Sequence, residues 1–304
     1  KLLLGKQDGD LLLLAGKADY VKPLKKNAGF EAGIKSSYVK ADNDVRFFNY
    51  INEQWVTDST TSNHFIYSEN INAAYLNIKK EWKKWSTQLG LRTEQTLAEG
   101  NQLISGETFD RHYLQVFPTA FLDYKINDKH GLNLNLGRRI DRPAYQQMNP
   151  FRELIDASTY AEGNPFLKPQ LTYNTALSYT YNQEFFATFN YSLTSDNITD
   201  VLLQDNQNQL TVQTVVNLNK LNYFSFDLNY SKKLTKWWTT NSSILAYYGL
   251  YAGTIRNVAI NQGTPTFYLN TNNSFTLSKV VSMECSFLYS HNSLDGITTI
   301  QPFY

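Results

Sequence analysis

The feature that most constrains the fold of this chain is a strict alternation of apolar and polar residues. It runs through GLNLNLGRR (131–139), ATFNYSLT (187–194), FSFDLNYS (224–231) and FEAGIKSSY (30–38). A period of two places successive side chains on opposite faces of a β-strand. Each run is therefore predicted to be a strand with one apolar face and one polar face, and no helical period of useful length competes with it.

The breaks between these runs predict a series of hairpins. Short polar turns recur roughly every 50 residues, at positions such as 25–28 and 182–184. Longer polar connections are predicted between them, at 42–63, 99–111, 142–170 and 253–263. Each strand then has a tight turn at one end and a loop at the other. We predict an all-β fold of about 12–13 antiparallel strands.

The lengths of these strands point to a membrane. Most runs span about ten or more residues, whereas strands of globular proteins usually have about 5–6. Tilted strands of about 9–11 residues cross a bilayer, and no apolar stretch is long enough for a transmembrane helix. The mean hydropathy of −0.43 agrees, because only every second residue of such a strand faces lipid. We therefore predict part of an antiparallel transmembrane β-barrel, with its apolar face on the lipid bilayer and a wet lumen inside.

Composition narrows the functional classes. The formal net charge is +1 and no Lys/Arg cluster stands out, which argues against a nucleic-acid partner. The four histidines lie far apart and lack metal-ligand spacing, so we predict neither a metal site nor a cofactor: His64, His112, His130 and His291. No Gly-x-Ser-x-Gly motif and no convergent nucleophile–base pair occurs, so we do not expect an enzyme.

Four of the five tryptophans flank short turns, beside lysines in EWKKW and KLTKWW. They are Trp82, Trp85, Trp237 and Trp238. Amphipathic aromatic rings prefer the membrane–water interface, where barrels carry aromatic girdles. We interpret these residues as part of such a girdle, and ordinary hairpin packing is the alternative.

The segment GRRIDRPAYQQMNPFRELIDASTYAEGNPFLKPQ, residues 137–170, is a long connection between two alternating runs. Its four prolines forbid a continuous strand ladder, and Gly163-Asn164-Pro165 predicts a tight turn. Arginines and aromatics make two roles possible, a structural lid that braces a barrel mouth or a surface that contacts a ligand. The structural role is favoured, because loop packing uses the same residue types. Candidate ligand contacts are Arg139, Arg142, Tyr145, Asn149 and Asn164.

This segment resembles the barrels of TonB-dependent outer-membrane receptors, in the subgroup called the outer membrane protein beta-barrel family. There, a strand leads into an Arg-Pro-x-Tyr…Asn-Pro-Phe loop, and Gly-Asn-Pro-x-Leu-x-Pro leads into the next strand. The matching positions are Arg142, Pro143, Tyr145, Asn149, Pro150, Phe151, Gly163, Asn164, Pro165, Leu167 and Pro169. The following FNYSLTSDNITDVL also fits the next hairpin of that family.

The resemblance implies a 22-stranded barrel, a plug domain inside it and an energy-coupling segment. This sequence shows neither a plug nor a coupling segment, and the chain stops in QPFY, within an apparent strand. We therefore expect residues 1–304 to be an incomplete barrel domain, the C-terminal-middle part of a receptor with both ends missing. A partial strand set leaves open edges, which a bilayer does not tolerate.

The resemblance also implies a function and partners. The whole protein would take up a siderophore, glycan, peptide or vitamin across the bacterial outer membrane. It would draw energy from a TonB–ExbB–ExbD complex and use its own plug, with a surface lipoprotein as a further possible partner. Alternatives are an outer-membrane barrel with another role, such as enzyme or adhesin, and a soluble β-repeat binding protein. Solubility distinguishes the soluble β-repeat protein from a barrel, because a β-propeller built of such repeats would purify without detergent.

Overall fold

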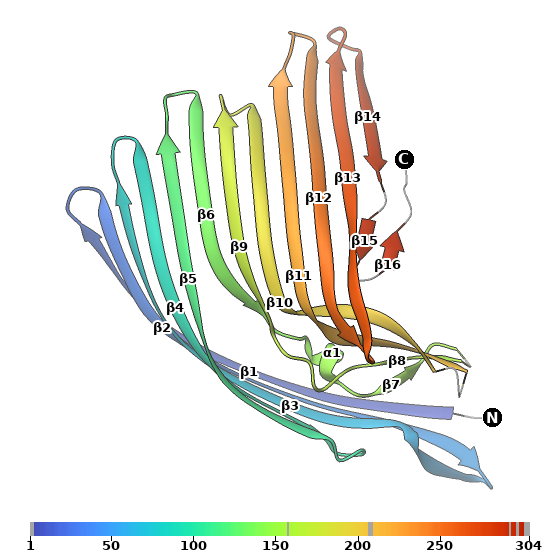
Figure 1. Ribbon diagram of the computed structural model, residues 1–304. Coiled ribbons are helices and arrows are strands. Elements are labelled where there is room, and N and C mark those ends of the chain that lie inside the picture. The colour runs from blue at the N-terminus through green and yellow to red at the C-terminus, as the bar shows by residue number, and fades with distance from the viewer. Residues whose placement is uncertain (1–2, 157, 206–208, 292, 296–297, 301–304) are drawn as a thin grey trace.

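The computed structural model describes residues 3–156, 158–205, 209–291, 293–295 and 298–300, most of them in strands (Figure 1). Twelve strands follow one another in a single path in which each is hydrogen-bonded to the next. They are β1 Leu3–Leu24, β2 Ala28–Ile51, β3 Gln54–Glu81, β4 Trp85–Gln102, β5 Thr108–Lys125, β6 His130–Asp141, β9 Gln170–Tyr181, β10 Phe185–Asp205, β11 Leu210–Lys233, β12 Trp238–Ile255, β13 Val258–Thr276 and β14 Ser282–Ser290. The predicted all-β fold and its strand count are confirmed, and a 22-strand total stays a prediction.

The chain between β6 and β9 leaves the main path of the sheet. This crossing segment, residues 142–169, holds the helix α1 (Tyr145–Met148) and the short strands β7 (Arg152–Leu154) and β8 (Thr159–Glu162). β7 pairs with β8, and β8 pairs with β11 in parallel, an exception to the predicted antiparallel pattern. Among the described residues, no helix combines the length and the apolar character that crossing a bilayer requires.

Tight turns join the strands at one end of the sheet, the upper end in Figure 1. Lys26 and Asn27 have φ values of 60° and 55°, and Asn182 and Gln183 have 52° and 58°. Two consecutive residues with positive φ form the mirror-image turns whose twist matches that of the strands they join. The turns predicted there are confirmed. The crossing segment lies toward the opposite end.

Two of the predicted long connections are wrong. The chain at 42–63 continues β2 and β3 to a two-residue turn at Asn52 and Glu53, and 253–263 continues β12 and β13 to a turn at Arg256 and Asn257. The connection at 99–111 shrinks to residues 103–107. Strand ends such as DNDVRFFNYI carry polar residues on both faces, so alternation disappears there although the backbone ladder continues.

The strand register separates an inner from an outer face. We define the inner face as the one that carries Arg92 and Glu94 of β4, against which the crossing segment packs. In register, Arg92 lies opposite Tyr75 of β3 and Phe117 of β5. Six charged residues of the alternating runs fall on this inner face by the same register: Glu31, Lys35, Arg92, Asp123, Asp227 and Glu284.

The outer face is apolar and largely uncovered. Leu114 is 69% exposed, Leu89 is 53% exposed and Phe226 is 46% exposed. Apolar surface on this scale marks contact with a partner, which for a sheet of long strands is a lipid bilayer. The small core instead lies on the inner face, beneath the crossing segment, where Phe65, Tyr67, Ala98 and Met148 form a buried cluster.

Candidate functional site

Arg142 fixes the start of the crossing segment to the inner face. Its Nη2 donates to Glu94 Oε2 at 2.7 Å and to Thr96 Oγ1 at 2.9 Å, both on β4. Its Nε lies 3.2 Å from the hydroxyl oxygen of Tyr113 and 3.5 Å from Glu69 Oε1. The Glu94 side chain is 1% exposed, so this guanidinium neutralises a carboxylate that the fold removes from water.

The helix α1 is anchored through apolar contacts. Met148 is 2% exposed and packs with Phe65, Tyr67 and Ala98. The ring of Tyr145 lies 5.2 Å from that of Phe65, and its hydroxyl donates to the Phe65 carbonyl oxygen at 3.3 Å. The same burial raises the pKa of the Tyr145 hydroxyl. Burying a methionine contributes about 1.5–3 kcal/mol, so four residues of helix are held by more than their own hydrogen bonds.

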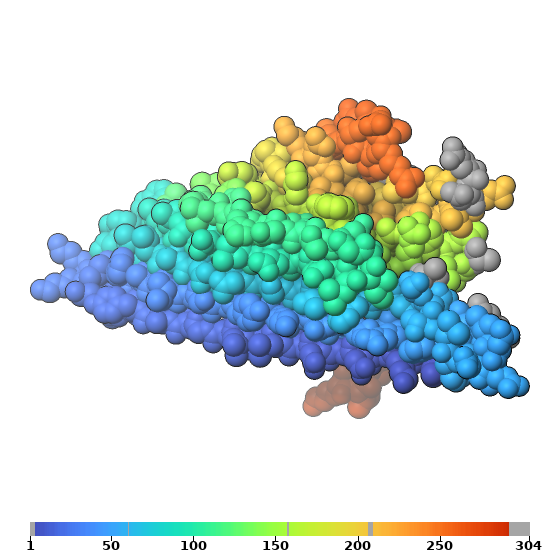
Figure 2. Space-filling view, turned by 90° about the horizontal axis from the view of Figure 1, so that it is seen from below, coloured from blue at the N-terminus to red at the C-terminus, as the bar shows by residue number. Residues whose placement is uncertain are grey.

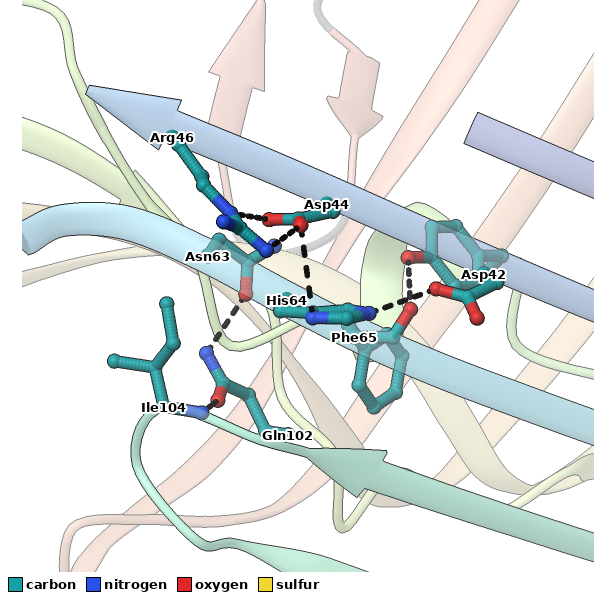
Figure 3. A network of polar contacts seen from close by, with 9 residues as sticks. Asp42, Asp44, Arg46, Asn63, His64, Phe65, Gln102 and Ile104 are labelled. Atoms are coloured by element: carbon teal, nitrogen blue, oxygen red, sulfur yellow. Dashed lines mark hydrogen bonds and ion pairs between the residues drawn. The ribbon is translucent and has the colours of Figure 1, made fainter. Parts of the chain in front are cut away.

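A chain of amides continues from α1 to the β4–β5 turn. Asn63 Nδ2 donates to Asn149 Oδ1 at 3.0 Å. Gln102 Nε2 donates to Asn63 Oδ1 at 2.7 Å (Figure 3). Gln102 Oε1 in turn accepts from the backbone N–H of Ile104 at 2.5 Å. Because Asn63 and Gln102 are buried, each amide needs its partner, and the crossing segment therefore fixes the position of this turn.

The Gly-Asn-Pro turn follows the path predicted from its sequence. The Leu167 N–H donates to the Asn164 carbonyl oxygen at 3.2 Å, and the Phe166 N–H donates to Asn164 Oδ1 at 2.9 Å. A Cβ on Gly163 would collide with the carbonyl oxygen of Asn149, which accepts the Gly163 N–H at 3.0 Å. Glycine is thus required by the close approach of two backbone stretches.

The second half of the crossing segment is held by β11 through neutral groups. Asn164 Nδ2 donates to the Val215 carbonyl oxygen at 3.0 Å. Asn217 Oδ1 accepts the Lys168 N–H at 2.8 Å, and its Nδ2 donates to the Lys168 carbonyl oxygen at 2.9 Å. Leu167, between these contacts, is fully buried. Together with the parallel β8–β11 pairing, these bonds tie the segment to the far half of the sheet.

The crossing segment therefore bridges the two halves of the sheet. One group of contacts reaches β3, β4 and β5, and the other reaches β11. Figure 2, seen from below, shows the yellow-green segment between the blue-to-cyan strands and the gold strands. This placement matches a lid that braces the sheet.

The five candidate ligand contacts occupy different environments. The Arg139 side chain is 63% exposed, with Asp141 Oδ2 at 3.5 Å from its Nε. The other four, Arg142, Tyr145, Asn149 and Asn164, bond to the sheet as described above. The structure brings those four into one packed segment and leaves Arg139 at its edge. Their part in ligand binding stays a prediction.

The four tryptophans lie at the tight-turn end of the sheet. Trp82, Trp85 and Trp237 are 56%, 43% and 49% exposed. The Trp85 ring stacks on Tyr124 of the neighbouring strand at 4.2 Å, and Trp238 stacks on Phe275 at 5.8 Å. The rings are thus available to solvent or lipid while being held by aromatic neighbours.

A second polar network lies beside the amide chain in Figure 3. His64 Nε2 lies 2.8 Å from Asp42 Oδ1, and its Nδ1 lies 3.9 Å from Asp44 Oδ2. Arg46 forms an ion pair with Asp44 at 2.5 Å. Within the described part of the chain, no three His, Cys, Asp or Glu side chains are grouped so that they could hold a metal ion.

Two charged features of the crossing segment and its surroundings were missed by sequence reasoning. Glu94 lies at a polar-face position of RTEQT, where alternation gives its face, but no signal in the sequence links it to Arg142.

At the tip of the crossing segment, the N–H and hydroxyl of Ser158 donate to Asp156 Oδ1 at 2.7 and 3.0 Å. These bonds lower the pKa of the Asp156 carboxyl. An acidic residue two positions before serine is the local signal for such a turn.

Known proteins share this architecture. The chain matches the outer membrane protein beta-barrel family over residues 5–304. Among solved structures, it is similar to the copper transporter OprC, with a TM-score of 0.69, 13% identity and coverage of 98% of this chain and 47% of that one. The siderophore receptor PiuA from Acinetobacter baumannii has a TM-score of 0.58 and 12% identity, with coverage of 99% of this chain and 48% of that one. The outer membrane transporter YddB from Escherichia coli has a TM-score of 0.54 and 14% identity, with coverage of 94% of this chain and 42% of that one.

The chain spans about half, or less, of the length of these solved structures. No curated protein sequence matches it. At such low identity the structural likeness concerns the fold, while the family match covers almost every residue. The chain therefore belongs to the outer membrane protein beta-barrel family and forms barrel wall in the bacterial outer membrane.

Proposed function

We propose that this chain is part of the barrel of a TonB-dependent receptor that moves a solute through its lumen with energy from a TonB–ExbB–ExbD complex. The observation that carries the proposal is the crossing segment, which lies on the inner face and joins two halves of the sheet. A segment in that place narrows the opening and gives the lumen a shaped entrance. A sheet whose only role was to span the membrane would not need it.

The proposal includes the missing parts. The strands of residues 1–304 would close with further strands into a barrel of 22, around a plug domain. The solute would be a siderophore, a glycan, a peptide or a vitamin, and a surface lipoprotein would assist capture. Support comes from the copper transporter and siderophore receptor that share the fold. Strands with an apolar outer face and a polar inner face suit a water-filled passage.

Orientation follows from the connections at the two ends of the sheet. Transmembrane barrels have short turns on the periplasmic side and longer connections outside. The turns beside the tryptophans are short, whereas the opposite end carries the crossing segment and the long hairpin extensions that end at Asn52–Glu53 and Arg256–Asn257. The tryptophans would therefore lie at the periplasmic interface, where they form an aromatic girdle. The crossing segment would lie toward the cell surface.

The test is protease cleavage of a short tag inserted after Ser158 in the full-length protein, in intact cells. Ser158 is exposed, at the tip of the crossing segment. Cleavage is expected without disruption of the outer membrane. A tag that is cut only after the membrane is breached would contradict the orientation, and a protein that fractionates without membranes would contradict the barrel. Uptake of candidate solutes should also stop when the coupling complex is deleted.

A further inference from the structure

One part of the inner face forms a basic hollow of about 570 Å³. Six basic residues and two carboxylates line it: Lys17, Lys35, Arg92, Arg138, Arg139, Arg142, Glu31 and Glu94. The whole chain has a formal net charge of only +1, so the positive surplus is a local property. Clefts lined by one sign of charge concentrate the opposite ion.

The strand register explains why the hollow exists. Lys17 of β1 lies directly opposite Lys35 of β2, and Lys35 lies directly opposite Ala73 of β3. Two like charges that face each other across strands destabilise the pair unless another group compensates them. The small side chain of Ala73 leaves room beside them, so the charges border open space rather than packed protein.

In the described ranges of the chain, nearby carboxylates pair with four of the six cations of the hollow and not with Lys35. Lys17 pairs with Asp19 at 2.7 Å and Arg139 with Asp141 at 3.5 Å. Arg92 and Arg142 share the carboxylate of Glu94, and Arg142 also lies 3.5 Å from Glu69. Lys35 is exposed and makes no ion pair or hydrogen bond within the described residues. Its ammonium group is therefore available to an anion from outside the sheet.

The remaining lining suits a bound anion. Asn77 and Thr119 offer neutral donors, and Phe117 gives the hollow an apolar side. Guanidinium groups bind carboxylate and phosphate through paired N–H donors, and lysine adds a point charge. In the part of the chain that the structure describes, Glu31 and Glu94 are the carboxylates of the lining, and Asp19 lies beside it, paired with Lys17.

We propose that the basic hollow binds a carboxylate or phosphate group of the solute during its passage along the lumen, an inference that rests on the proposed transport function. The position supports it. The hollow lies next to Arg142, at the start of the crossing segment, and thus on the wall that a solute meets below the entrance.

The test is binding of inorganic pyrophosphate to the full-length protein in detergent at low ionic strength. Broadening of the ³¹P NMR line of pyrophosphate measures this binding. We expect Lys35→Gln to weaken binding about tenfold, because it removes one charge-assisted contact to the anion. Lys35→Arg, which keeps the charge, should bind like the wild type. Added salt should weaken binding to the wild type more than to Lys35→Gln.

Lys233→Gln is the matched control, because it removes the same charge from an exposed residue of β11 outside the hollow. Equal affinity of Lys35→Gln and the wild type would overturn the proposal. Pyrophosphate binding that appears only after the plug is deleted would also overturn the proposal, because the hollow would then be covered by the plug in the whole protein. The measurement needs no energised membrane, so its failure is separate from a failure of uptake in cells.

Discussion

The inner face has two walls with different chemistry. We call β1–β6 the charged wall and β9–β14 the hydroxyl-rich wall. The charged wall carries the basic hollow and the buried Glu94. The hydroxyl-rich wall bonds its neighbours through neutral groups, such as the hydroxyls of Thr172 and Thr194 at 2.9 Å and of Ser178 and Thr188 at 3.0 Å.

This difference teaches that a polar face is not one kind of surface. On the hydroxyl-rich wall, hydroxyl groups of neighbouring strands bond to one another, and the Asp227 carboxylate accepts from Asn190 and Ser225 of the same wall. On the charged wall, carboxylates and guanidinium groups depend on a residue from the crossing segment, Arg142. The crossing segment is thus held by ionic bonds at one end and by neutral bonds at the other.

The largest expected effect comes from breaking the ionic end. Arg142→Ala leaves the buried Glu94 with Arg92 alone and leaves Glu69 without its arginine, and should lower the free energy of unfolding by about 3–5 kcal/mol. Urea unfolding followed by tryptophan fluorescence measures it. Arg139→Ala is the control and should change stability by less than about 0.5 kcal/mol, because that side chain is exposed. Equal effects of the two variants would erase the distinction between a buried anchor and a surface charge.

Breaking the neutral end should cost less. Asn217→Ala removes the two bonds to Lys168 and a third to the Asp196 carbonyl oxygen at 2.8 Å. The expected loss is about 1–3 kcal/mol, and it should not change with salt. The same unfolding experiment at low and high salt tests this, with Asn229→Ala as an exposed control. A salt-dependent loss would show that the two ends of the segment do not differ in kind.

The outer face should not share the difference between the walls. Trp85 borders the charged wall and stacks on Tyr124. Trp238 borders the hydroxyl-rich wall, stacks on Phe275 and Trp237, and donates its indole N–H to Asn273 Oδ1 at 2.9 Å. Trp85→Ala should therefore cost about 1–2 kcal/mol in liposomes, and Trp238→Ala should cost more, by about the 0.5–1.5 kcal/mol of one hydrogen bond. The melting temperatures of the two variants in liposomes give the comparison. A larger loss for Trp85→Ala would mean that the charges of the inner face, and not the contacts of each ring, decide the stability here.

The smallest expected effect concerns the tip of the crossing segment. The Ser158 bonds depress the pKa of Asp156, so the stability they add is present above the ordinary carboxyl pKa and is lost as pH falls through the lowered value. Below about pH 4, the bond from the Thr211 N–H to the Ser158 carbonyl oxygen, 2.7 Å long, should open more often. Hydrogen exchange at Thr211 measures this opening. In Asp156→Asn that extra opening should be absent, and if it persists the carboxyl is not its cause.

Much of this architecture was predictable from the sequence because period-two alternation is a local signal. It gave the strands, the face of residues such as Lys35 and Asp227, and the tight turns. It failed in strand ends such as 42–63, where both faces carry polar residues although the ladder continues. The loop residues Arg142 and Asn164 were found by motif.

The partners of those loop residues were not predictable. The bonds from Arg142 to Glu94 and from Asn63 to Asn149 join residues 48 and 86 positions apart. The local sequence does not specify which distant residue is the partner, because every polar-face residue of every strand fits the same alternation. The basic hollow is equally hidden, since Lys17 and Arg139 meet only when six strands are placed side by side.

The parallel β8–β11 pairing has a geometric consequence. The crossing segment is attached to β4 at Arg142 and to β11 at residues 159–161, while the sheet between those strands passes through β5, β6, β9 and β10. It is therefore a chord drawn across an arc. The arc length is set by the number of strands and the chord length by the crossing segment. Two fixed lengths define one radius, so this short stretch of chain sets how tightly the wall curves and hence how wide the opening beside it is.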